Sequence, residues 1–399
     1  MTELEKACTA ADRARSNRCS SFYRDLYQGL AQPITPEQWT QVPFLTKSDI
    51  LRVPFMQRLF VPWEKVDTIA LTSGTTGSGV CILPRRFSLD LPSDFPYYKD
   101  HRLMTFYYYS YRIRAESKTI SGDQTRYEAS AQLAAQAGVD ALHGSISQLI
   151  AFAPHAKRAG LISNIRALCS TGERISKLQL NTIRTLYPGA ELRTVYGMQE
   201  VSVAGYSPLV PRPDRPLAVK LVPHYYFEIL TEEGLVADSG TGELVVTSLE
   251  EDPFPLMRYR TGDKVSVFED RGERLLEPLS RVEEERVRIG GGEIVLDELE
   301  RAITKTFGES VADFECTVKE TLDGETIRSG LDLTLFIKNN PPPWSSTDAA
   351  LKLATELQAN QQRTYLDGIV AGLYTPITCS FMLVGGTQLQ KRRHLRDGR

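Results

Sequence analysis

The chain has 399 residues, of which 41% are hydrophobic and 24% are charged, as in an ordinary globular protein with about two or three domains. Lysine and arginine number 47 against 50 aspartate and glutamate, so the formal net charge is −3. The chain therefore lacks the basic field that non-specific nucleic-acid binding requires, and this argues against a DNA-coating role.

The cysteines stand singly in the sequence, without a C-x-x-C pair or a histidine at zinc-finger spacing. They are Cys8, Cys19, Cys81, Cys169, Cys316 and Cys379. This pattern predicts reduced thiols and no structural metal. The first residues, MTELEKACTAADRARSN, are charged, and no apolar run of about 18 residues follows anywhere in the chain. We therefore expect a soluble, cytoplasmic protein.

The chain up to about Leu51 has the pattern of helices and turns, and Thr46 is expected to cap a short helix. From Val66, VDTIALTSGTTGSGVCIL predicts a strand, a loop of Gly, Ser and Thr, and a second strand. An aromatic run then follows, PYYKDHRLMTFYYYSYR. It fits either a strand with alternate side chains in the core or, with Tyr108, the flat walls of a pocket for an aryl acid.

Helices and strands alternate in the next part of the chain. The predicted order is a helix over 127–137, a strand in VDALHG, a helix in SISQLIAFAPHAKRAG, a strand and turn in IRALCSTGE, a helix to Leu186 and a strand in ELRTVYG. This alternation predicts βαβ units and a largely parallel sheet. The segments VKLVPHYYFEIL, GELVVTSL and KVSVFE, between 218 and 267, predict a mixed or barrel-like β section.

The pattern changes again after the charged turn SRVEEER. EIVLDELERAITKTFG predicts a helix, VADFECTVKE and GLDLTLFIK predict strands, DAALKLATELQANQQRTYLDGI predicts a helix and ITCSFMLVGG a last strand. We therefore expect two domains. Residues 1–280 form a large N-terminal domain of α/β and β structure, with parallel and mixed sheets plus a β-rich subdomain. Residues 281–399 form a smaller, mobile α+β C-terminal domain.

Three strings carry candidate chemistry. LTSGTTGSG, from Leu71 to Gly79, has the glycines and hydroxyls that cradle a phosphate, although a flexible turn has the same composition and the GK[ST] of a Walker A loop is missing. In TVYGMQE, Glu200 follows a predicted strand, where it is either a Mg²⁺ ligand or a solvated loop acid. In RYRTGD, Asp263 occupies a predicted tight turn, either as an acceptor for ribose hydroxyls or as a simple Asp turn.

Taken together and in this order, TSGTTG, YGMQE, YRTGD, an Arg-led acidic turn, a Gly-rich segment and a C-terminal lysine resemble the AMP-forming acyl-CoA synthetase and adenylation-domain (ANL) superfamily. CSSFYRDLY, VPFLTKSDIL and RYRTGD resemble its phenylacetate–CoA ligase branch. The resemblance covers nearly the whole chain. It implies a ligase that converts ATP and a small carboxylic acid, expected to be aromatic, to an acyl-AMP and passes the acyl group to a thiol, that of coenzyme A.

The resemblance also implies which residues bind the nucleotide and the metal. The ATP phosphates would be held by Thr72, Ser73, Gly74, Thr75, Thr76 and Gly77. Gly172 and Glu173 would lie against the adenine and the acyl pocket. Tyr196, followed by Gly197, would stack on the adenine, Asp263 would hold the ribose diol and Glu200 would bind Mg²⁺.

Further roles follow for the C-terminal region. Arg281 matches the arginine of the hinge motif, and Glu283 stands at its acidic hinge position. Gly291 and Gly292 align with the loop that acts in thioester formation. Lys391 matches the adenylation lysine, a cation that would stabilise charge on the α-phosphate in the transition state.

Several positions depart from the family pattern, since Ser78 replaces a lysine, Gln199 replaces Thr or Ser, and Gln390 replaces the Gly before the lysine. His143, in LHGS after a predicted strand, is either structural or part of the acyl pocket. Two other functions stay open: acyl transfer to an amine or a carrier-protein thiol in a biosynthetic pathway, and a catalytically inactive binding homologue. We expect no nucleic-acid or membrane partner, and a homodimer is one option for assembly.

Overall fold

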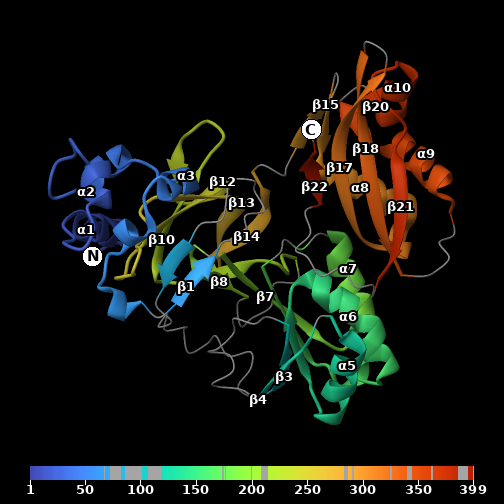
Figure 1. The fold of residues 1–399 in the computed structure, drawn as a ribbon, viewed down its shortest axis with the longest axis horizontal. Coiled ribbons are helices and arrows are strands. Elements are labelled where there is room, and N and C mark those ends of the chain that lie inside the picture. Colours follow the sequence, from blue (N-terminus) through green and yellow to red (C-terminus); the bar gives the residue numbers. More distant parts are fainter. Residues whose placement is uncertain are drawn as a thin grey trace. The chain divides into compact units, whose positions relative to one another are not determined.

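The computed structural model describes most of the chain. The described residues are 1–66, 68–71, 82–85, 101–106, 118–123, 125–172, 175, 177–198, 200–207, 214–282, 286–289, 292–323, 326–338, 344–360, 363–384 and 394–398. The chain divides into two compact units, each built from two separate stretches of sequence (Figure 1). The first unit comprises Met1–Phe95 and Val195–Leu279, and the second comprises Pro96–Thr194 and Ser280–Arg399.

The first unit opens with short helices. They are α1 (Glu3–Arg15), α2 (Phe22–Leu26), η1 (Pro36–Gln41), α3 (Lys47–Leu51), η2 (Phe55–Arg58) and η3 (Trp63–Lys65). Thr46 caps α3, as predicted. Its hydroxyl accepts a hydrogen bond from the Asp49 amide, and the Asp49 carboxylate accepts one from the Thr46 amide in return. This reciprocal capping box satisfies two backbone donors and sets the start of the helix.

The strands of the first unit are mostly antiparallel. β1 (Thr68–Leu71) and β2 (Ile82–Arg85) pair with each other and confirm the two strands predicted around the Gly/Ser/Thr string. The others follow the order β11-β10-β12-β13-β14-β9-β8-β7. Their bounds are β7 Glu191–Met198, β8 Ser202–Tyr206, β9 Val219–Leu221, β10 Tyr225–Leu230, β11 Val236–Ala237, β12 Gly240–Ser248, β13 Tyr259–Asp270 and β14 Glu273–Arg281. The section predicted after residue 218 is rich in strands, as expected, but β10, β11, β12 and β13 pair antiparallel in an open strand order and not in a mixed or barrel-like form.

The second unit contains the predicted βαβ part. Its elements are β3 (Arg102–Thr105), β4 (Lys118–Ser121), α5 (Tyr127–Gln136), β5 (Ala141–Gly144), α6 (Ile146–Arg158), η4 (Ile162–Asn164), β6 (Ala167–Thr171) and α7 (Lys177–Leu186). The strands run parallel in the order β6-β5-β3-β4. Met104, Leu142 and Leu168 pack into one hydrophobic core with residues of α5, α6 and α7. Phe106 is buried in the same core, so the core interpretation of the aromatic run holds for this residue.

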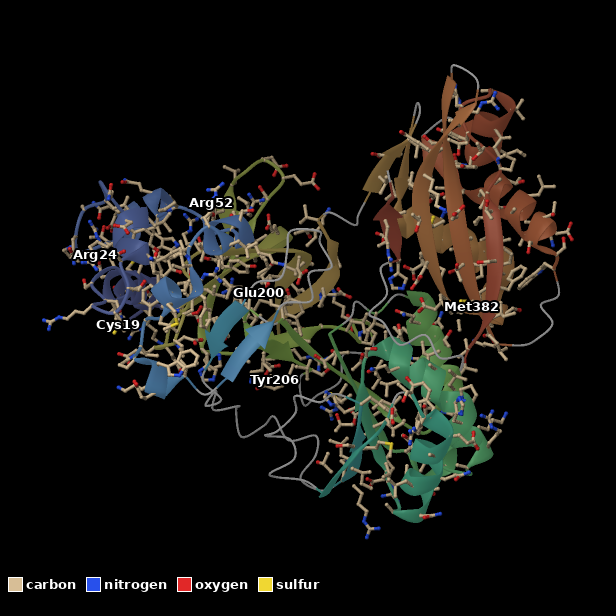
Figure 2. All side chains as sticks on the ribbon, viewed as in Figure 1. Cys19, Arg24, Arg52, Glu200, Tyr206 and Met382 are labelled. Atoms are coloured by element: carbon tan, nitrogen blue, oxygen red, sulfur yellow. The ribbon has the colours of Figure 1, made fainter. Side chains whose placement is uncertain are left out.

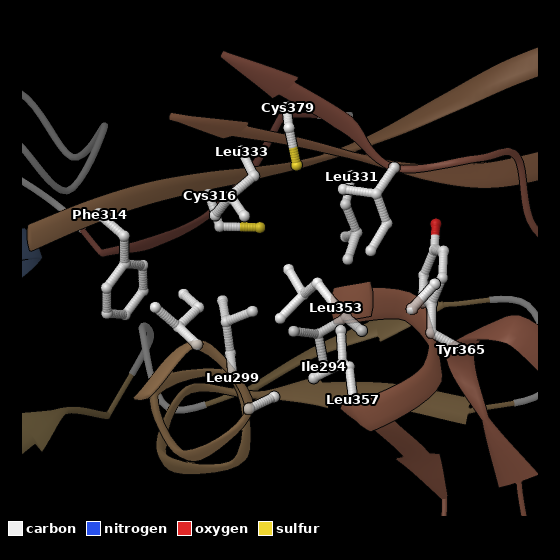
Figure 3. Packing of buried hydrophobic residues seen from close by; sticks show 14 of the residues in the cluster. Ile294, Leu299, Phe314, Cys316, Leu331, Leu333, Leu353, Leu357, Tyr365 and Cys379 are labelled. Atoms are coloured by element: carbon white, nitrogen blue, oxygen red, sulfur yellow. The ribbon is translucent and has the colours of Figure 1, made fainter. Parts of the chain in front are cut away.

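The C-terminal stretch of the second unit forms an α+β structure. Its elements are β15 (Arg286–Ile289), β16 (Gly292–Val295), α8 (Leu296–Phe307), η5 (Gly308–Ser310), β17 (Val311–Asp323), β18 (Thr326–Ile337), α9 (Ser346–Glu356), β19 (Gln358–Asn360), β20 (Arg363–Thr364), α10 (Tyr365–Val370), β21 (Thr378–Leu383) and β22 (Leu395–Asp397). The main sheet has the order β21-β18-β17-β22. Figure 3 shows Cys316 and Leu333 of this sheet pointing toward Leu299 and Leu353 of the helices.

This arrangement confirms the predicted fold class, a large α/β and β part with a smaller α+β C-terminal region. The βαβ part and the C-terminal region each have a hydrophobic core of their own, although both belong to the second unit. The domain boundary between residues 280 and 281 stays a prediction. None of the helices in the described ranges is long and apolar enough to cross a membrane.

Two predicted helices of the C-terminal region are wrong in part. Gly292–Val295 is strand β16, where Ile294 pairs with Val287 of β15, so the helix begins only at Leu296. The helix predicted over 348–369 is interrupted by β19 and β20. Leu357, which ends α9 in an extended backbone conformation, and Ala359 of β19 are both buried in the C-terminal core. Thr364 then caps a new helix, α10, through a capping box with Asp367.

We expect Leu353→Ala in α9 to lower the free energy of unfolding by roughly 2–5 kcal/mol, because it removes a fully buried side chain from the C-terminal core. Leu351 lies on the same helix with 56% of its surface exposed, so Leu351→Ala is the matched control. Urea denaturation followed by tryptophan fluorescence measures both, since Trp344 packs against this core. If both substitutions lowered the free energy of unfolding equally, the burial of Leu353 in this core would be contradicted.

Candidate functional site

Asp263, the predicted ribose-binding acid, lies within strand β13 and not in a tight turn. Gly262, directly before it, has φ +72, and the register between β12 and β13 shifts between Glu243 and Val245. The prediction of a turn is wrong because the left-handed glycine, which favours a turn when only the sequence is known, here forms an irregularity in a continuous strand.

Glu243 holds this irregularity in place. Its Oε1 accepts a hydrogen bond from the Gly262 amide at 3.0 Å, and its Oε2 accepts one from Arg260 Nε at 2.9 Å. The hydroxyl of Thr261 donates to the carbonyl of Leu244 at 2.8 Å. These bonds join Arg260, Thr261 and Gly262 to β12, so the backbone that leads into Asp263 is held against the neighbouring strand.

Tyr196 and Asp263 are in direct contact. The Tyr196 hydroxyl, on β7, donates to Asp263 Oδ2, on β13, at 2.7 Å. Both side chains are half-buried, and Gly197 follows Tyr196 at a register shift between β7 and β8. A carboxylate accepts several hydrogen bonds at once, so the bond from Tyr196 is compatible with ribose hydroxyls at the same group. The structure thus brings together two residues for which the motifs predict contacts with one nucleotide.

Glu200 follows β7 and is half-buried (Figure 2). The hydroxyl of Tyr259, the first residue of β13, lies 3.5 Å from Glu200 Oε1, the outer limit of a hydrogen bond. No group of three potential metal ligands occurs among the residues that the structure describes. A single carboxylate still suits Mg²⁺, because this ion keeps several waters and takes its other ligands from substrate phosphates. Tyr259 is therefore a neighbour of Glu200 that the sequence did not predict, although it stands inside the RYRTGD string.

Arg258, which precedes Tyr259, is a buried cation with a left-handed backbone, φ +46. Its Nε and Nη2 donate to the two carboxylate oxygens of Glu228 at 3.2 and 3.0 Å, and Glu228 is also buried. Burial raises the pKa of Glu228, and the positive charge of Arg258 opposes this rise. The indole of Trp39 donates to the same carboxylate at 3.0 Å.

The Arg258 cluster also fastens an N-terminal segment to β13. Arg258 Nη1 donates to the carbonyl of Val42 at 2.7 Å, and the guanidinium lies 4.2 Å from the ring centre of Phe44. The Leu45 amide donates to the Arg258 carbonyl at 3.0 Å, and the Arg260 amide donates to the Leu45 carbonyl at 2.9 Å. The start of the RYRTGD string is therefore paired with a segment from the beginning of the chain.

In the second unit, Gly172 directly follows β6, at the carboxyl end of the parallel strands. Its φ is +81, a left-handed conformation that glycine adopts without strain. Ligands of open α/β sheets bind outside this edge, which is where the motifs predict a turn against the adenine.

His143 lies within β5 and not after it, which corrects its predicted place. Its Nδ1 is 2.9 Å from Thr105 Oγ1 on the neighbouring strand β3. Burial lowers the pKa of His143 to about 4, so the imidazole is neutral at physiological pH. Its hydrogen bond and burial are those of a structural histidine, and a role in the acyl pocket stays a prediction.

Gly292 opens strand β16, so the predicted loop at this position is strand from Gly292 onward. A Cβ at Gly292 would lie 2.4 Å from the carbonyl oxygen of Ala359, so the close approach of the two backbones requires glycine. Arg281 is the last residue of β14. A role of Gly292 in thioester formation and of Arg281 at a hinge stay predictions.

The other residues of the predicted site lie outside the described residues. They are Thr72 to Gly77 of the phosphate loop, Tyr108 of the aromatic run, Glu173, the hinge residue Glu283, Gly291 and Lys391, together with Ser78 and Gln199. The roles predicted for them stay predictions.

Neither a protein-family model nor a curated protein sequence matches this chain, but solved structures do. One of them is a 2-hydroxyisobutyryl-CoA ligase in the postadenylation state, in complex with 2-HIB-AMP. The similarity covers 99% of this chain and 89% of the ligase chain, with a TM-score of 0.72 and 17% sequence identity. Another is the acyl acid amido synthetase AtGH3.15 in complex with 2,4-DB. The similarity covers 98% of this chain and 91% of the synthetase chain, with a TM-score of 0.65 and 14% sequence identity.

A third similar structure is the anthranilate CoA ligase AuaEII in complex with anthranoyl-AMP. The similarity covers 82% of this chain and 65% of the AuaEII chain, with a TM-score of 0.54 and 16% sequence identity. At such identities these likenesses show the fold. The chain has the fold of adenylate-forming enzymes, so the resemblance predicted from the motifs is confirmed at this level.

We expect the burial of His143 to make stability depend on pH. The unfolded histidine titrates near pH 6.5 and the folded one near 4, so the unfolded chain binds more protons between these values. The free energy of unfolding therefore contains the full contribution of the neutral, buried His143 above pH 6.5. This contribution falls by about 2 kcal/mol from pH 7 to pH 5. Urea denaturation at both pH values, with His143→Gln as the comparison, measures this difference. An NMR titration of His143 with a midpoint near 6.5 would contradict it.

Proposed function

We propose that this protein is an AMP-forming ligase. It would join a carboxylic acid to ATP as an acyl-adenylate, release pyrophosphate and pass the acyl group to the thiol of coenzyme A. The observation that carries the proposal is the 2.7 Å hydrogen bond between Tyr196 and Asp263, in a chain whose fold is similar to that of adenylate-forming enzymes. Two residues assigned to one nucleotide by separate motifs thereby lie close together, which is compatible with their binding the same ligand.

The chemistry fits the residue types of the site. A carboxylate and a triphosphate are both anions, so their reaction needs positive charge to offset repulsion and to stabilise the transition state. Mg²⁺, when bound, would supply part of this charge and be held by Glu200, whose Oε1 lies 3.5 Å from the Tyr259 hydroxyl. Lys391 would supply the rest. No side-chain nucleophile is required, because the attacking group is the carboxylate of the substrate.

The acid and the acceptor belong to the proposal as well. We propose an aromatic acid because of the aromatic run PYYKDHRLMTFYYYSYR in the sequence, and coenzyme A because of the phenylacetate–CoA ligase motifs. A second candidate is transfer to an amine, and the likeness to an acyl acid amido synthetase over 98% of this chain favours it.

A pyrophosphate-exchange assay with a panel of aryl, heteroaryl and aliphatic acids tests the proposed activity. We expect ATP-dependent exchange, with a planar aromatic monocarboxylate faster than a linear fatty acid of similar size. The best acid is then offered coenzyme A, amino acids or a carrier protein as acceptors. No exchange with any acid would indicate an inactive binding homologue, and a preference for an aliphatic chain would refute the aromatic assignment.

We expect Asp263→Ala to raise the KM for ATP by about tenfold or more, because it removes hydrogen bonds to a charged group. Glu200→Gln should instead lower the kcat of exchange by about tenfold to a hundredfold, because its main effect is on charge in the transition state. Asp270→Asn, at the far end of the same strand β13, is the matched control and should leave both constants unchanged. Wild-type exchange in both site variants would show that the assignment is wrong.

A further inference from the structure

The pairing of β12 with β13 changes at the TGD string. Val245 and Glu243 of β12 lie opposite Arg260 and Lys264 of β13. Three residues of β13 thus lie between these two pairs, where β12 has only one, so β13 carries a bulge. Residues in a bulge leave the regular ladder of backbone hydrogen bonds, and their amides need other acceptors.

Side chains provide these acceptors. Glu243 Oε1 accepts from the Gly262 amide at 3.0 Å. The Thr261 hydroxyl accepts from the Asp263 amide at 3.1 Å and itself donates to the Leu244 carbonyl at 2.8 Å. Both Glu243 and Thr261 are buried. Two buried side chains therefore take the place of the backbone ladder across the bulge.

The Gly262 amide lies directly before the acid proposed to hold the ribose. Gly262 has φ +72, and glycine adopts left- and right-handed conformations without steric cost. Its own preference therefore does not hold the backbone in this conformation. A hydrogen bond from its amide to a charged oxygen is stronger than one to a neutral acceptor, and it selects one conformation among several. The direction in which Asp263 leaves the strand follows from that selection.

Arg260 orients the Glu243 carboxylate. Its Nε donates to Oε2 at 2.9 Å, and its Nη2 donates to the same oxygen. Oε1 is thereby directed to the Gly262 amide. The Arg260 side chain is 42% exposed, so water can replace the carboxylate at its guanidinium, and such half-exposed ion pairs contribute little. The main effect of losing the Glu243 carboxylate is therefore expected at Gly262.

We propose that Glu243 and Thr261 are positioning residues for ATP binding. By accepting from the amides of Gly262 and Asp263, they set the backbone from which the Asp263 carboxylate reaches the ribose. This carboxylate also accepts from the Tyr196 hydroxyl on β7, so its direction has to suit both contacts. Glu243 and Thr261 act through Asp263, and the inference rests on the role that the proposed function gives to this acid.

The test uses the full-length chain and measures the Kd for ATP by isothermal titration calorimetry, together with the KM and kcat of pyrophosphate exchange. Glu243→Leu removes the acceptor, whereas Glu243→Gln keeps a carbonyl oxygen that can accept from the Gly262 amide. Thr261→Val removes the other side-chain acceptor with little change in size. Val267→Ala is the matched control, because it truncates a buried side chain of β13 that lies opposite Gly240, outside the bulge.

We expect Glu243→Leu and Thr261→Val to raise the Kd and the KM for ATP by about threefold to tenfold, with kcat near the wild-type value. Glu243→Gln should recover most of the lost affinity, and Val267→Ala should keep the wild-type constants. Because Glu243 acts through Asp263, adding Glu243→Leu to Asp263→Ala should raise the Kd no further.

Additive effects of Glu243→Leu and Asp263→Ala on the Kd would overturn the inference, since Glu243 would then act independently of the acid. A wild-type Kd in Glu243→Leu, or no recovery in Glu243→Gln, would overturn it as well. If Glu243→Leu does not fold, Thr261→Val decides, alone and combined with Asp263→Ala: a raised Kd that does not add supports the inference, and any other result refutes it.

The same measurements separate this inference from the proposed function. If the wild type binds ATP but shows no pyrophosphate exchange with any acid, the proposed ligase activity fails, and the Kd values still decide on Glu243 and Thr261. If exchange is normal and the Kd of the variants is unchanged, the inference alone fails. A wild type that does not bind ATP refutes both.

Discussion

The candidate nucleotide site in the first unit depends on one buried ion pair, that of Arg258 with Glu228. Removing two charges from water is expensive, and mutual attraction offsets this cost only when further hydrogen bonds complete the geometry. Here the indole of Trp39 and the carbonyl of Val42 supply those bonds. Removing one partner of such a pair typically costs about 3–5 kcal/mol, since the other charge stays buried. The conformation at the start of β13 is therefore strongly specified.

The side chains of the candidate site are placed by this conformation along β13. Arg258 has a left-handed backbone, the next residue is Tyr259, which contacts Glu200, and the irregularity at Gly262 leads to Asp263. A left-handed conformation costs energy for a residue other than glycine, and it persists where the surrounding structure determines it. Here the buried ion pair and the backbone hydrogen bonds to Leu45 hold Arg258 in this conformation. The buried packing around Arg258 thus sets the geometry of the candidate site.

Local patterns in the sequence predicted the elements that have local causes. The capping box at Thr46, the parallel strands around His143 and the hairpin of β17 and β18 depend on neighbouring residues and on regular periodicity. The break in the helix predicted over 348–369 depends instead on tertiary packing, because Leu357, the residue that ends α9, and Ala359 of β19 are both buried in the C-terminal core. The contacts of Arg258 could not be predicted either, since no local pattern pairs it with Glu228 or with Trp39. The same holds for Glu243 and Gly262, whose hydrogen bond depends on the pairing of β12 with β13.

The position of β22 has a consequence for biosynthesis. β17 and β18 are adjacent in the sequence and can pair as soon as both have been synthesised, whereas β22 follows only after α9, α10 and β21. Until then, the side of β17 that later binds Leu395–Asp397 presents unpaired N–H and C=O groups. Such an open edge can pair with strands of other chains and is a common start of aggregation. A ribosome that stalls or terminates before codon 395 would release a chain with this edge exposed, and quality-control factors that bind strand edges would have their target there.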